Sequence, residues 1–304
     1  MKAMILAAGL GTRLRPLTLK RPKVLLPVAN RPLIERTIAY LKAQGISAIA
    51  VNAHHCHRQI VEHLTHASTF GVGIDVRVEQ EILGTGGGIK NMADFWDAEP
   101  FIVINGDIVT DIDLSRAYEM HQRKGALATL VLHDYGPFNK IRVDRSFDIR
   151  DIPREKPLDN SRRLAFTGVH VIDPALLTYI PDGVFSDIID CYRGLIKSSR
   201  PPHAHVVKGH YWRDIGTVGS YVLANKEYLI KDNSFIVAPN CRINPSVRLT
   251  EWAVIGENGT LEEGVEIKRS ILWDKVKVRR DVKIIDSIVT SMKEVKDDLI
   301  NAII

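Results

Sequence analysis

Residues 6–27 read "LAAGLGTRLRPLTLKRPKVLLP", and the interpretation of the whole chain starts from this stretch. A short apolar strand runs into Gly9 and Gly11, and five basic residues interleaved with three prolines follow. Backbone N–H groups of a glycine turn can approach a phosphate closely, and cations after the turn can reach the same anion. Arg13 offers a fork for two phosphate oxygens, and Lys23 offers a point charge. The stretch predicts a phosphate-binding loop, and a solvated basic loop is the alternative.

Two better-known phosphate loops fit this stretch poorly. Leu14 stands where the dinucleotide fingerprint needs its third glycine, and the second apolar strand, "AIAVNA" at 48–53, carries no acidic residue for a ribose. No GK[ST] follows the glycines, which excludes a Walker loop.

Up to about residue 230, short apolar runs alternate with longer amphipathic ones. "AMILAA" is followed by "PLIERTIAYLKAQG", then "AIAVNA", "RQIVEHLTHA" and further pairs of the same kind. This alternation predicts an α/β fold, Rossmann-like, with a mixed and mostly parallel sheet covered by helices. Ligands of such sheets collect at the carboxyl ends of the strands. The glycine-arginine stretch, "EILGTGGG" at 81–88 and "NGD" at 105–107 are all expected at that edge.

After about residue 233 the apolar residues repeat with a period of six. The first places of the hexads are Ile243, Leu249, Ile255, Leu261, Ile267 and Trp273, and the fifth places are Val247, Ala253, Gly259, Val265 and Ile271. The register then slips by one and resumes at Val278, Val282, Ile284 and Ile288. The period predicts a short left-handed parallel β-helix whose first and fifth places point inward, with an irregular β-sandwich as the alternative. We therefore expect two domains, 1–232 and 233–304.

Composition limits the partners and the compartment. The chain has 304 residues and a formal net charge of +5, and its basic residues are spread along the sequence. This mild charge favours a small anionic ligand over a nucleic acid, and no run of about twenty apolar residues predicts a membrane span. Three cysteines lie far apart without CxxC spacing, which argues against disulfides and zinc and predicts a reducing, cytoplasmic location.

The opening stretch resembles the GxGTRxxPxTxxxPKxxxP signature of the sugar-1-phosphate nucleotidylyltransferases. The resemblance continues in the family's order and covers about residues 1–230; its further motifs are "LGTGGGIKN" at 83–91, "NGD" at 105–107, "REKP" at 154–157, "FTGVHV" at 166–171 and "YWRDIGT" at 211–217. It implies an enzyme that joins a nucleoside triphosphate to a sugar 1-phosphate, releasing pyrophosphate. The product is a nucleotide sugar, of the kind that supplies cell envelope polysaccharides.

The same resemblance implies a role for each matching residue. Asp107 and Asp214 match the family's two Mg²⁺ carboxylates. Arg13 would stabilise the departing pyrophosphate and Lys23 the α-phosphate. Lys156 would hold the sugar phosphate, and Glu155 and Gly168 would meet the sugar. The nucleotide-binding set is Leu6, Ala8, Gly9, Gly11, Thr12, Arg13, Lys23, Glu79, Gly84 and Thr85.

The base and the sugar are less well determined. Glu79 stands where several family members place a glutamine, and a carboxylate can accept both N1–H and N2–H of guanine but only one N–H of uracil. GTP is favoured, with mannose or a heptose as the first choice of sugar. The chain also resembles uridylyltransferases acting on N-acetylmuramate 1-phosphate, so UTP with that sugar phosphate or glucose 1-phosphate is the alternative. Phe166 replaces an asparagine of many relatives, which puts one sugar contact in doubt.

Two other classes of function fit the sequence less well. A non-catalytic regulatory subunit that binds nucleotide sugar would be favoured by loss of Arg13, Lys23 or an aspartate, but all are present. An acyltransferase activity in the hexad region would need a histidine base, and His210 is the last histidine, before the hexads begin. We therefore expect residues 233–304 to form a homo-oligomer contact rather than a second catalytic site.

Overall fold

The computed structural model describes residues 1–65, 70–155, 162–232 and 234–304, with the side chains of 230–232 also outside the description. The chain divides into two compact units. The first consists of Met1–Leu10 and Ile34–Asp214, and the second of Gly11–Leu33 and Ile215–Ile304. This division differs from the domains 1–232 and 233–304 expected from the sequence, which stay a prediction, because the glycine-arginine loop groups with the C-terminal part of the chain.

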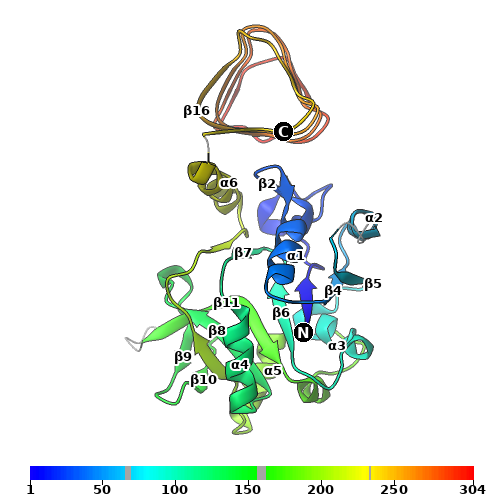
Figure 1. Ribbon diagram of the computed structural model, residues 1–304, viewed down its shortest axis with the longest axis vertical. Coiled ribbons are helices and arrows are strands. Elements are labelled where there is room, and N and C mark those ends of the chain that lie inside the picture. The colour runs from blue at the N-terminus through cyan, green and yellow to red at the C-terminus, as the bar shows by residue number, and fades with distance from the viewer. Residues whose placement is uncertain (66–69, 156–161, 233) are drawn as a thin grey trace. The chain divides into compact units, whose positions relative to one another are not determined.

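The first unit is built around a mixed sheet whose central strands are parallel (Figure 1). β1 (Lys2–Leu6) lies between β4 (Ala48–Ala53) and β6 (Phe101–Asn105), and β5 (Gly73–Val78) pairs with β4. β1, β4 and β6 are largely buried, which explains why they read as continuous apolar runs rather than as alternating ones. Their carboxyl ends lie at one edge of the sheet, as predicted.

The remaining strands introduce the antiparallel part of the sheet. β11 (Arg163–Ile172) is antiparallel to β6, to β8 (Ala128–His133) and to β9 (Ile141–Val143). β12 (His203–Val206) is parallel to β8, and β10 (Ile149–Asp151) pairs with β9. The predicted α/β class with a mixed, mostly parallel sheet is thereby confirmed.

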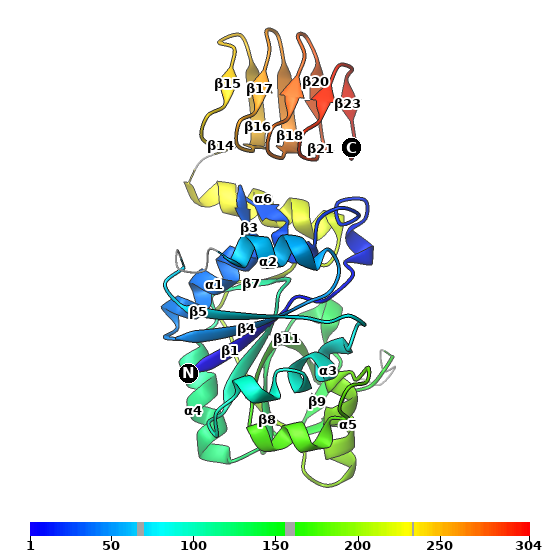
Figure 2. The same ribbon diagram turned by 90° about the vertical axis from the view of Figure 1, so that its right-hand side faces the viewer.

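Helices of the first unit pack against the sheet (Figure 2). They are α1 (Leu33–Ala43, whose first residue belongs to the second unit), α2 (His57–Thr65), α3 (Gly84–Lys90), α4 (Leu114–Lys124) and α5 (Ile188–Lys197). On one face, Ile89 of α3 and Tyr192 of α5 share a core with Met4 and Val103 of the sheet. No helix within the described ranges combines the length and the apolar run that a membrane crossing requires.

The second unit contains α6 (Val218–Asp232) and a stack of short parallel strands. These are β14 (Phe235–Val237), β15 (Arg242–Ile243), β16 (Arg248–Ile255), β17 (Thr260–Leu261), β18 (Glu266–Leu272), β19 (Lys277–Val278), β20 (Lys283–Ile285), β21 (Ile288–Val289), β22 (Glu294–Val295) and β23 (Leu299–Ile300). Their coils have a triangular outline in Figure 1 and are stacked side by side in Figure 2. The parallel pairing fits the predicted β-helix, whose left-handed sense stays a prediction.

The length of the coil shortens along the stack. Arg248 pairs with Glu266 eighteen residues on, Glu266 with Lys283 after seventeen, and Ile284 with Leu299 after fifteen. Left-handed backbone conformations recur about once per coil at Asn240, Asn258, Lys275 and Met292, and again at Glu251, Arg269, Asp286 and Asn301. Four of these eight residues are Asn or Asp, which tolerate this conformation better than most residues and therefore suit the sharp turns between strands.

The sequence-based register of the β-helix was wrong at three positions. The core contains Leu272 instead of the predicted Ile271 and Trp273, and Val289 instead of the predicted Ile288. The one-residue slip therefore comes before Leu272 rather than after Trp273, at the irregular pairing where the coil shortens from eighteen to seventeen residues. Because successive side chains of a strand point to opposite faces, Ile271, Trp273 and Ile288 point outward. All three are nevertheless buried, because other segments of the second unit cover them.

Candidate active site

Two short strands bring the predicted metal carboxylates together. β7 (Ile108–Thr110) pairs antiparallel with β13 (Trp212–Asp214), and Asp214 lies directly opposite Ile108, the residue after Asp107. This register puts the Cα atoms of Asp107 and Asp214 about 6 Å apart by ordinary strand geometry. Thr110 Oγ1 donates to the carbonyl of Tyr211 at 2.7 Å, which fixes the far end of the ribbon.

The donor set of this ribbon suits a magnesium ion. Asp107 and Asp214 are both half-buried carboxylates. Mg²⁺ typically takes one or two protein carboxylates and completes its octahedron with phosphates and waters. Within the described ranges, no three His, Cys, Asp or Glu side chains are grouped as metal ligands. A pair of carboxylates that leaves most positions to substrate fits the ion that the sequence predicts.

Gly168, predicted to meet the sugar, lies against the same ribbon. Its φ is +78°, and a Cβ there would come within 2.9 Å of Asn105 Nδ2 and 3.1 Å of Ile108 Cγ1. Trp212 Nε1 donates to the carbonyl of Thr167 at 2.8 Å. Glycine is therefore required at position 168 both by the backbone conformation and by the close approach of β6 and β7. Of the other predicted sugar residues, Glu155 is exposed, and Lys156 lies outside the described residues.

The end of β1 joins this site through the backbone. The carbonyl of Leu6 accepts a hydrogen bond from Gly106 N at 3.0 Å, so the predicted nucleotide residues Leu6 and Ala8 lie beside the loop that carries Asp107. At Gly9, a Cβ would meet no atom within 4 Å. The turn after β1 therefore has open space at the position where the signature expects a phosphate.

Glu79, predicted to read the base, is a buried structural carboxylate. Its side chain is 3% exposed. Oε1 accepts from Asn52 Nδ2 at 2.7 Å, and Oε2 accepts from Leu83 N at 2.9 Å. Asn52 Oδ1 in turn accepts from Ala7 N at 2.8 Å. This chain of hydrogen bonds ties the end of β1 to the start of α3, and both carboxylate oxygens already have partners within the protein.

Asn52 was not identified from the sequence. It lies at 2% exposure in β4, among apolar residues. A buried amide must find partners, so a single asparagine inside the apolar run "AIAVNA" was the available signal.

The glycines of 84–88 allow close packing rather than free phosphate contact. Gly86 N and Gly87 N both donate to the carbonyl of Ser186, at 2.8 and 3.1 Å, and a Cβ on Gly84 would come within 2.6 Å of the same oxygen. Thr85 Oγ1 donates to Asp187 Oδ1 at 3.0 Å and accepts from Ile188 N at 2.9 Å. Gly84 and Thr85, which are predicted to contact the nucleotide, therefore also have a structural role.

The second unit carries the cationic part of the signature. Gly11 has φ of +62° and precedes a 3₁₀ turn, η1 (Thr12–Leu14), that exposes Arg13. Thr18 Oγ1 donates to the carbonyl of Gly11 at 2.7 Å and closes this part of the loop. Lys23 is half-buried and begins a second 3₁₀ turn, η2 (Lys23–Leu25), directly after Pro22. Arg13 and Lys23 thus belong to one unit, and Asp107 and Asp214 to the other.

An aromatic cluster beside β13 was also missed. His133 Nδ1 lies 3.0 Å from His210 Nε2, and the rings of Tyr135 and Trp212 pack on His133 with centroids 5.5 and 4.7 Å away. Burial, together with the neighbouring His210, lowers the pKa of His133 to about 4. His133 is therefore neutral near pH 7. The cluster forms the neighbourhood of Trp212, two residues before Asp214.

Comparison with known proteins shows the family to which the chain is related. The family model described as nucleotidyl transferase matches residues 2–231. A putative mannose-1-phosphate guanyltransferase of Sulfolobus acidocaldarius is 31% identical over 89% of this chain and 75% of its own length. An N-acetylmuramate alpha-1-phosphate uridylyltransferase of Neisseria meningitidis is 35% identical over 72% of this chain and 94% of its own.

A solved structure shows the same fold. The crystal structure of a putative glucose-1-phosphate thymidylyltransferase from Bacillus anthracis, in complex with sucrose, is similar with a TM-score of 0.65. The two proteins are 27% identical, and the match covers 76% of this chain and 96% of the other. The chain belongs to the nucleotidyl transferase family.

Proposed function

We propose that the protein is a sugar-1-phosphate nucleotidylyltransferase, which transfers a nucleoside monophosphate from a triphosphate to a sugar 1-phosphate and releases pyrophosphate. The observation that carries the proposal is the pairing of β7 with β13, because it makes neighbours of two aspartates that are 107 positions apart in the sequence. The relatives are named for sugar 1-phosphates in each case, although they differ in the base.

Asp107 and Asp214 would hold the Mg²⁺ ion. When bound, the ion would offset the mutual repulsion of the two phosphate-bearing substrates. Arg13 would bind the departing pyrophosphate through its planar fork, and Lys23 would neutralise the α-phosphate as a point charge. The protein's contribution in this proposal is positioning and electrostatic stabilisation, as is usual in phosphoryl transfer.

The attacking group needs no general base. The second pKa of a phosphate monoester is about 6, so a sugar 1-phosphate is already largely a dianion at neutral pH. Its oxygen can attack the α-phosphorus in line without transferring a proton to the protein. Gly168 and Glu155 would contact the sugar, and Lys156 its phosphate.

GTP with mannose 1-phosphate, or a heptose 1-phosphate, is the substrate pair that we propose first. Relatives named as mannose-1-phosphate guanyltransferases match 85 to 91% of the chain, more than the 230 residues of the family domain. A UTP–glucose-1-phosphate uridylyltransferase of Synechocystis also extends beyond that domain, at 81% of the chain, whereas the uridylyltransferase of Neisseria meningitidis matches 72%. Because both oxygens of Glu79 have partners within the chain, the choice of base draws no support from that residue. UTP with N-acetylmuramate 1-phosphate or glucose 1-phosphate is the second choice.

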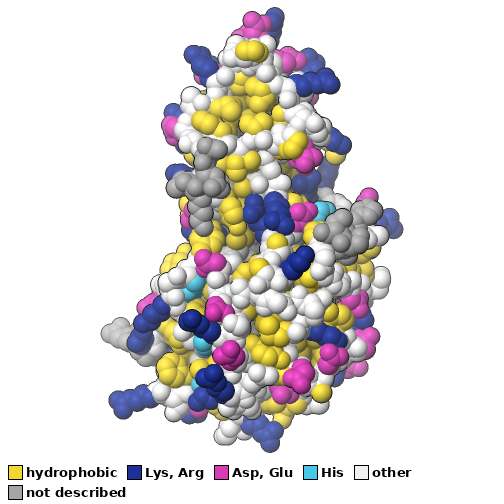
Figure 3. Space-filling model, viewed as in Figure 1, with side chains coloured by type: hydrophobic (Ala, Val, Ile, Leu, Met, Phe, Trp, Pro, Cys, Tyr) yellow, Lys and Arg dark blue, Asp and Glu magenta, His cyan; other side chains and the backbone are white. Residues whose placement is uncertain are grey.

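We also propose that the first coil of the β-helix contacts a second copy of the chain. β14 pairs only with β16, and β15 only with β17, among the described residues, so each has one unpaired edge. Val237 and Ile243 on this coil are 43% and 36% exposed, and Figure 3 shows hydrophobic side chains gathered on this end of the β-helix. An unpaired edge of this kind pairs readily with another strand.

The proposed activity is tested by pyrophosphate release from the full chain with Mg²⁺. Four nucleoside triphosphates are assayed against a set of hexose, heptose and N-acetylmuramate 1-phosphates. The proposal expects turnover that requires both substrates, highest with GTP and mannose or heptose 1-phosphate. Absence of pyrophosphate with every pair would contradict it, and highest turnover with UTP would select the second choice.

A further inference from the structure

We infer that the β-helix and α6 hold the signature loop in its ligand-binding conformation, so that the binding of triphosphate by Lys23 depends on residues of the C-terminal part of the chain. The loop in question is Gly11–Leu33, and we call its contacts through Arg21, Pro27, Tyr221 and Trp273 the loop clamp. The kinetic consequence of this inference rests on the proposed function, whereas its structural basis is independent of it. All the residues concerned lie in the second unit.

Arg21 contacts the β-helix at two points. Its guanidinium carbon lies 4.6 Å from the ring centroid of Trp273, a cation–π arrangement. Its Nη2 donates to Ser291 Oγ at 3.1 Å. Desolvation by burial lowers the pKa of Arg21, while Asp274 opposes that shift. A partly buried guanidinium stacked on an indole is a specific contact, unlike the solvated arginine that a surface loop would carry.

Trp273 also reaches the far side of the loop through α6. Trp273 Nε1 donates to the hydroxyl of Tyr221 at 2.9 Å, and Tyr221 donates to the carbonyl of Pro27 at 2.7 Å. Tyr221 is completely buried. Because Nε1–H can only donate, the Tyr221 hydroxyl must accept from it and use its own hydrogen for Pro27. The indole therefore helps to fix both Arg21 and Pro27.

Further hydrogen bonds hold the residues that follow Pro27. Asn225 Oδ1 accepts from Ala29 N at 2.8 Å, and Asn225 Nδ2 donates to the carbonyl of Tyr221 at 2.9 Å. Asn30 Nδ2 donates to the carbonyl of Ile255 in the β-helix at 2.7 Å. Asn225 is completely buried, which shields the amide end of its two hydrogen bonds from water.

Lys23 lies between the two fixed points. It is two residues after Arg21 and four before Pro27, and the intervening Pro22 restricts the backbone directly before it. Restraining both sides of a short segment leaves the lysine few alternative backbone positions. Binding a charged ligand then costs less conformational entropy than with a free loop. The loop clamp would accordingly act on affinity for the triphosphate.

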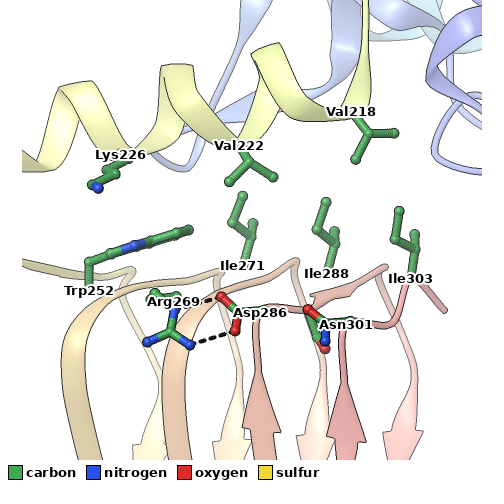
Figure 4. Close-up of a pocket in the computed structure, with 11 residues that line it drawn as sticks. Val218, Val222, Lys226, Trp252, Arg269, Ile271, Asp286, Ile288, Asn301 and Ile303 are labelled. Carbon is green, nitrogen blue, oxygen red and sulfur yellow. Dashed lines mark hydrogen bonds and ion pairs between the residues drawn. The ribbon is translucent and has the colours of Figure 1, made fainter.

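The outward face of the β-helix fits this role. Ile271 and Ile288 face Val218 and Val222 of α6 across a cavity of about 440 Å³ (Figure 4). Tyr221, the residue before Val222, donates its hydroxyl hydrogen to the carbonyl of Pro27 in the loop. α6 thus contacts the β-helix through its valines and joins the β-helix to the loop through Tyr221. The same outward positions explain why the sequence register failed there.

The test compares two buried tryptophans of the β-helix in the full chain. Trp273→Leu removes the indole that joins Arg21 to Tyr221 in the loop clamp. Trp252→Leu is the matched control, because Trp252 is 7% exposed, lines the cavity, and makes no hydrogen bond or cation–π contact with the described residues of the loop. In Trp273→Leu we expect the KM for triphosphate to rise at least about tenfold while the KM for sugar 1-phosphate changes less than about twofold. Trp273→Phe should recover part of the loss, since a benzene ring keeps the cation–π contact but not the N–H donor.

A double-mutant cycle and hydrogen exchange complete the test. Arg21→Gln combined with Trp273→Leu should raise the KM for triphosphate by less than the product of the two single effects, because the two substitutions share the cation–π contact. Amides of residues 20–30 should exchange faster in Trp273→Leu than in Trp252→Leu, whether or not the chain is active. Equal exchange in the two variants, or equal rises in both KM values, would overturn the inference. Faster exchange in a chain that releases no pyrophosphate with any substrate would leave the clamp standing and contradict only the proposed function.

Discussion

Asn52 and Glu79 form a buried hydrogen bond of 2.7 Å that joins β4 to the segment after β5. Through Ala7 N on one side and Leu83 N on the other, the pair connects the turn after β1 to the glycine-rich α3. A resemblance assigned Glu79 to the base, whereas its surroundings give it a clear structural task. The two roles predict different results for one substitution.

Glu79→Gln should lower stability by about 1 to 3 kcal/mol, because one amide hydrogen would then face a backbone or side-chain donor in a buried place. Glu81→Gln, at an exposed position, should change stability by less than about 0.5 kcal/mol. Urea unfolding of both variants measures this difference. If stability were unchanged and the preference for GTP fell instead, the base-reading prediction would be supported against the structural one.

Gly168→Ala should destabilise the protein by more than about 1 kcal/mol, because alanine must adopt a positive φ while its methyl group approaches Asn105. Gly194→Ala is the control, since a Cβ there meets no atom within 4 Å and glycine is unfavourable inside α5. That variant should gain about 0.5 to 1 kcal/mol. Thermal unfolding compares the two variants, and equal shifts of Tm would contradict the claim that position 168 requires glycine.

The protein should lose stability as the pH falls from about 6.5 to 4, in part through His133. Its folded pKa is about 4, so between these values the unfolded chain binds a proton that the folded chain excludes. Above pH 6.5 neither state is protonated, and the contribution is fully present. His133→Gln should reduce the loss over this window by about 2 kcal/mol. Parallel unfolding curves for wild type and variant at pH 7 and pH 4.5 would contradict the assignment.

Leu272→Ala should destabilise the second unit by about 2 to 5 kcal/mol, because Leu272 is 1% exposed in the β-helix core. Ile300→Ala, at 62% exposure, should cost less than about 0.5 kcal/mol. Guanidinium unfolding followed by tryptophan fluorescence measures both. If Leu272→Ala cost as little as Ile300→Ala, Leu272 would point outward, as the sequence-based register implies.

The alternation of strands and helices was sufficient to predict the α/β fold of the first unit, and the hexad period was sufficient to predict a repetitive stack of short strands in the second. Strong local periodicity survives folding because burial on one face imposes it. The register of the last coils was not predictable, because Leu272 and Trp273 are both large and apolar. Trp273 points outward but is buried under Arg21 and Tyr221, and the sequence does not show that these segments cover it.

The sequence named Asp107 and Asp214 as candidate site residues, which stay a prediction, but it could not show how they are arranged. Asp107 and Asp214 become neighbours through a three-residue ribbon, β7 with β13, which is too short to leave a pattern in the sequence. Asn52 carries no motif at all, and its importance follows only from three partners in space. The clamp on Arg21 depends on a contact with a residue more than 250 positions away, which nothing in the signature indicates.

The most direct test of the account is pyrophosphate release by Asp107→Asn and Asp214→Asn as a function of Mg²⁺ concentration. Asp113→Asn is the control, because asparagine keeps the N-cap that Asp113 provides to α4. We expect each of the first two variants to lose at least about a hundredfold in turnover with an unchanged fold, and the control to behave as wild type. Wild-type turnover in either Asp107→Asn or Asp214→Asn would contradict the shared magnesium site, and with it the proposed reaction.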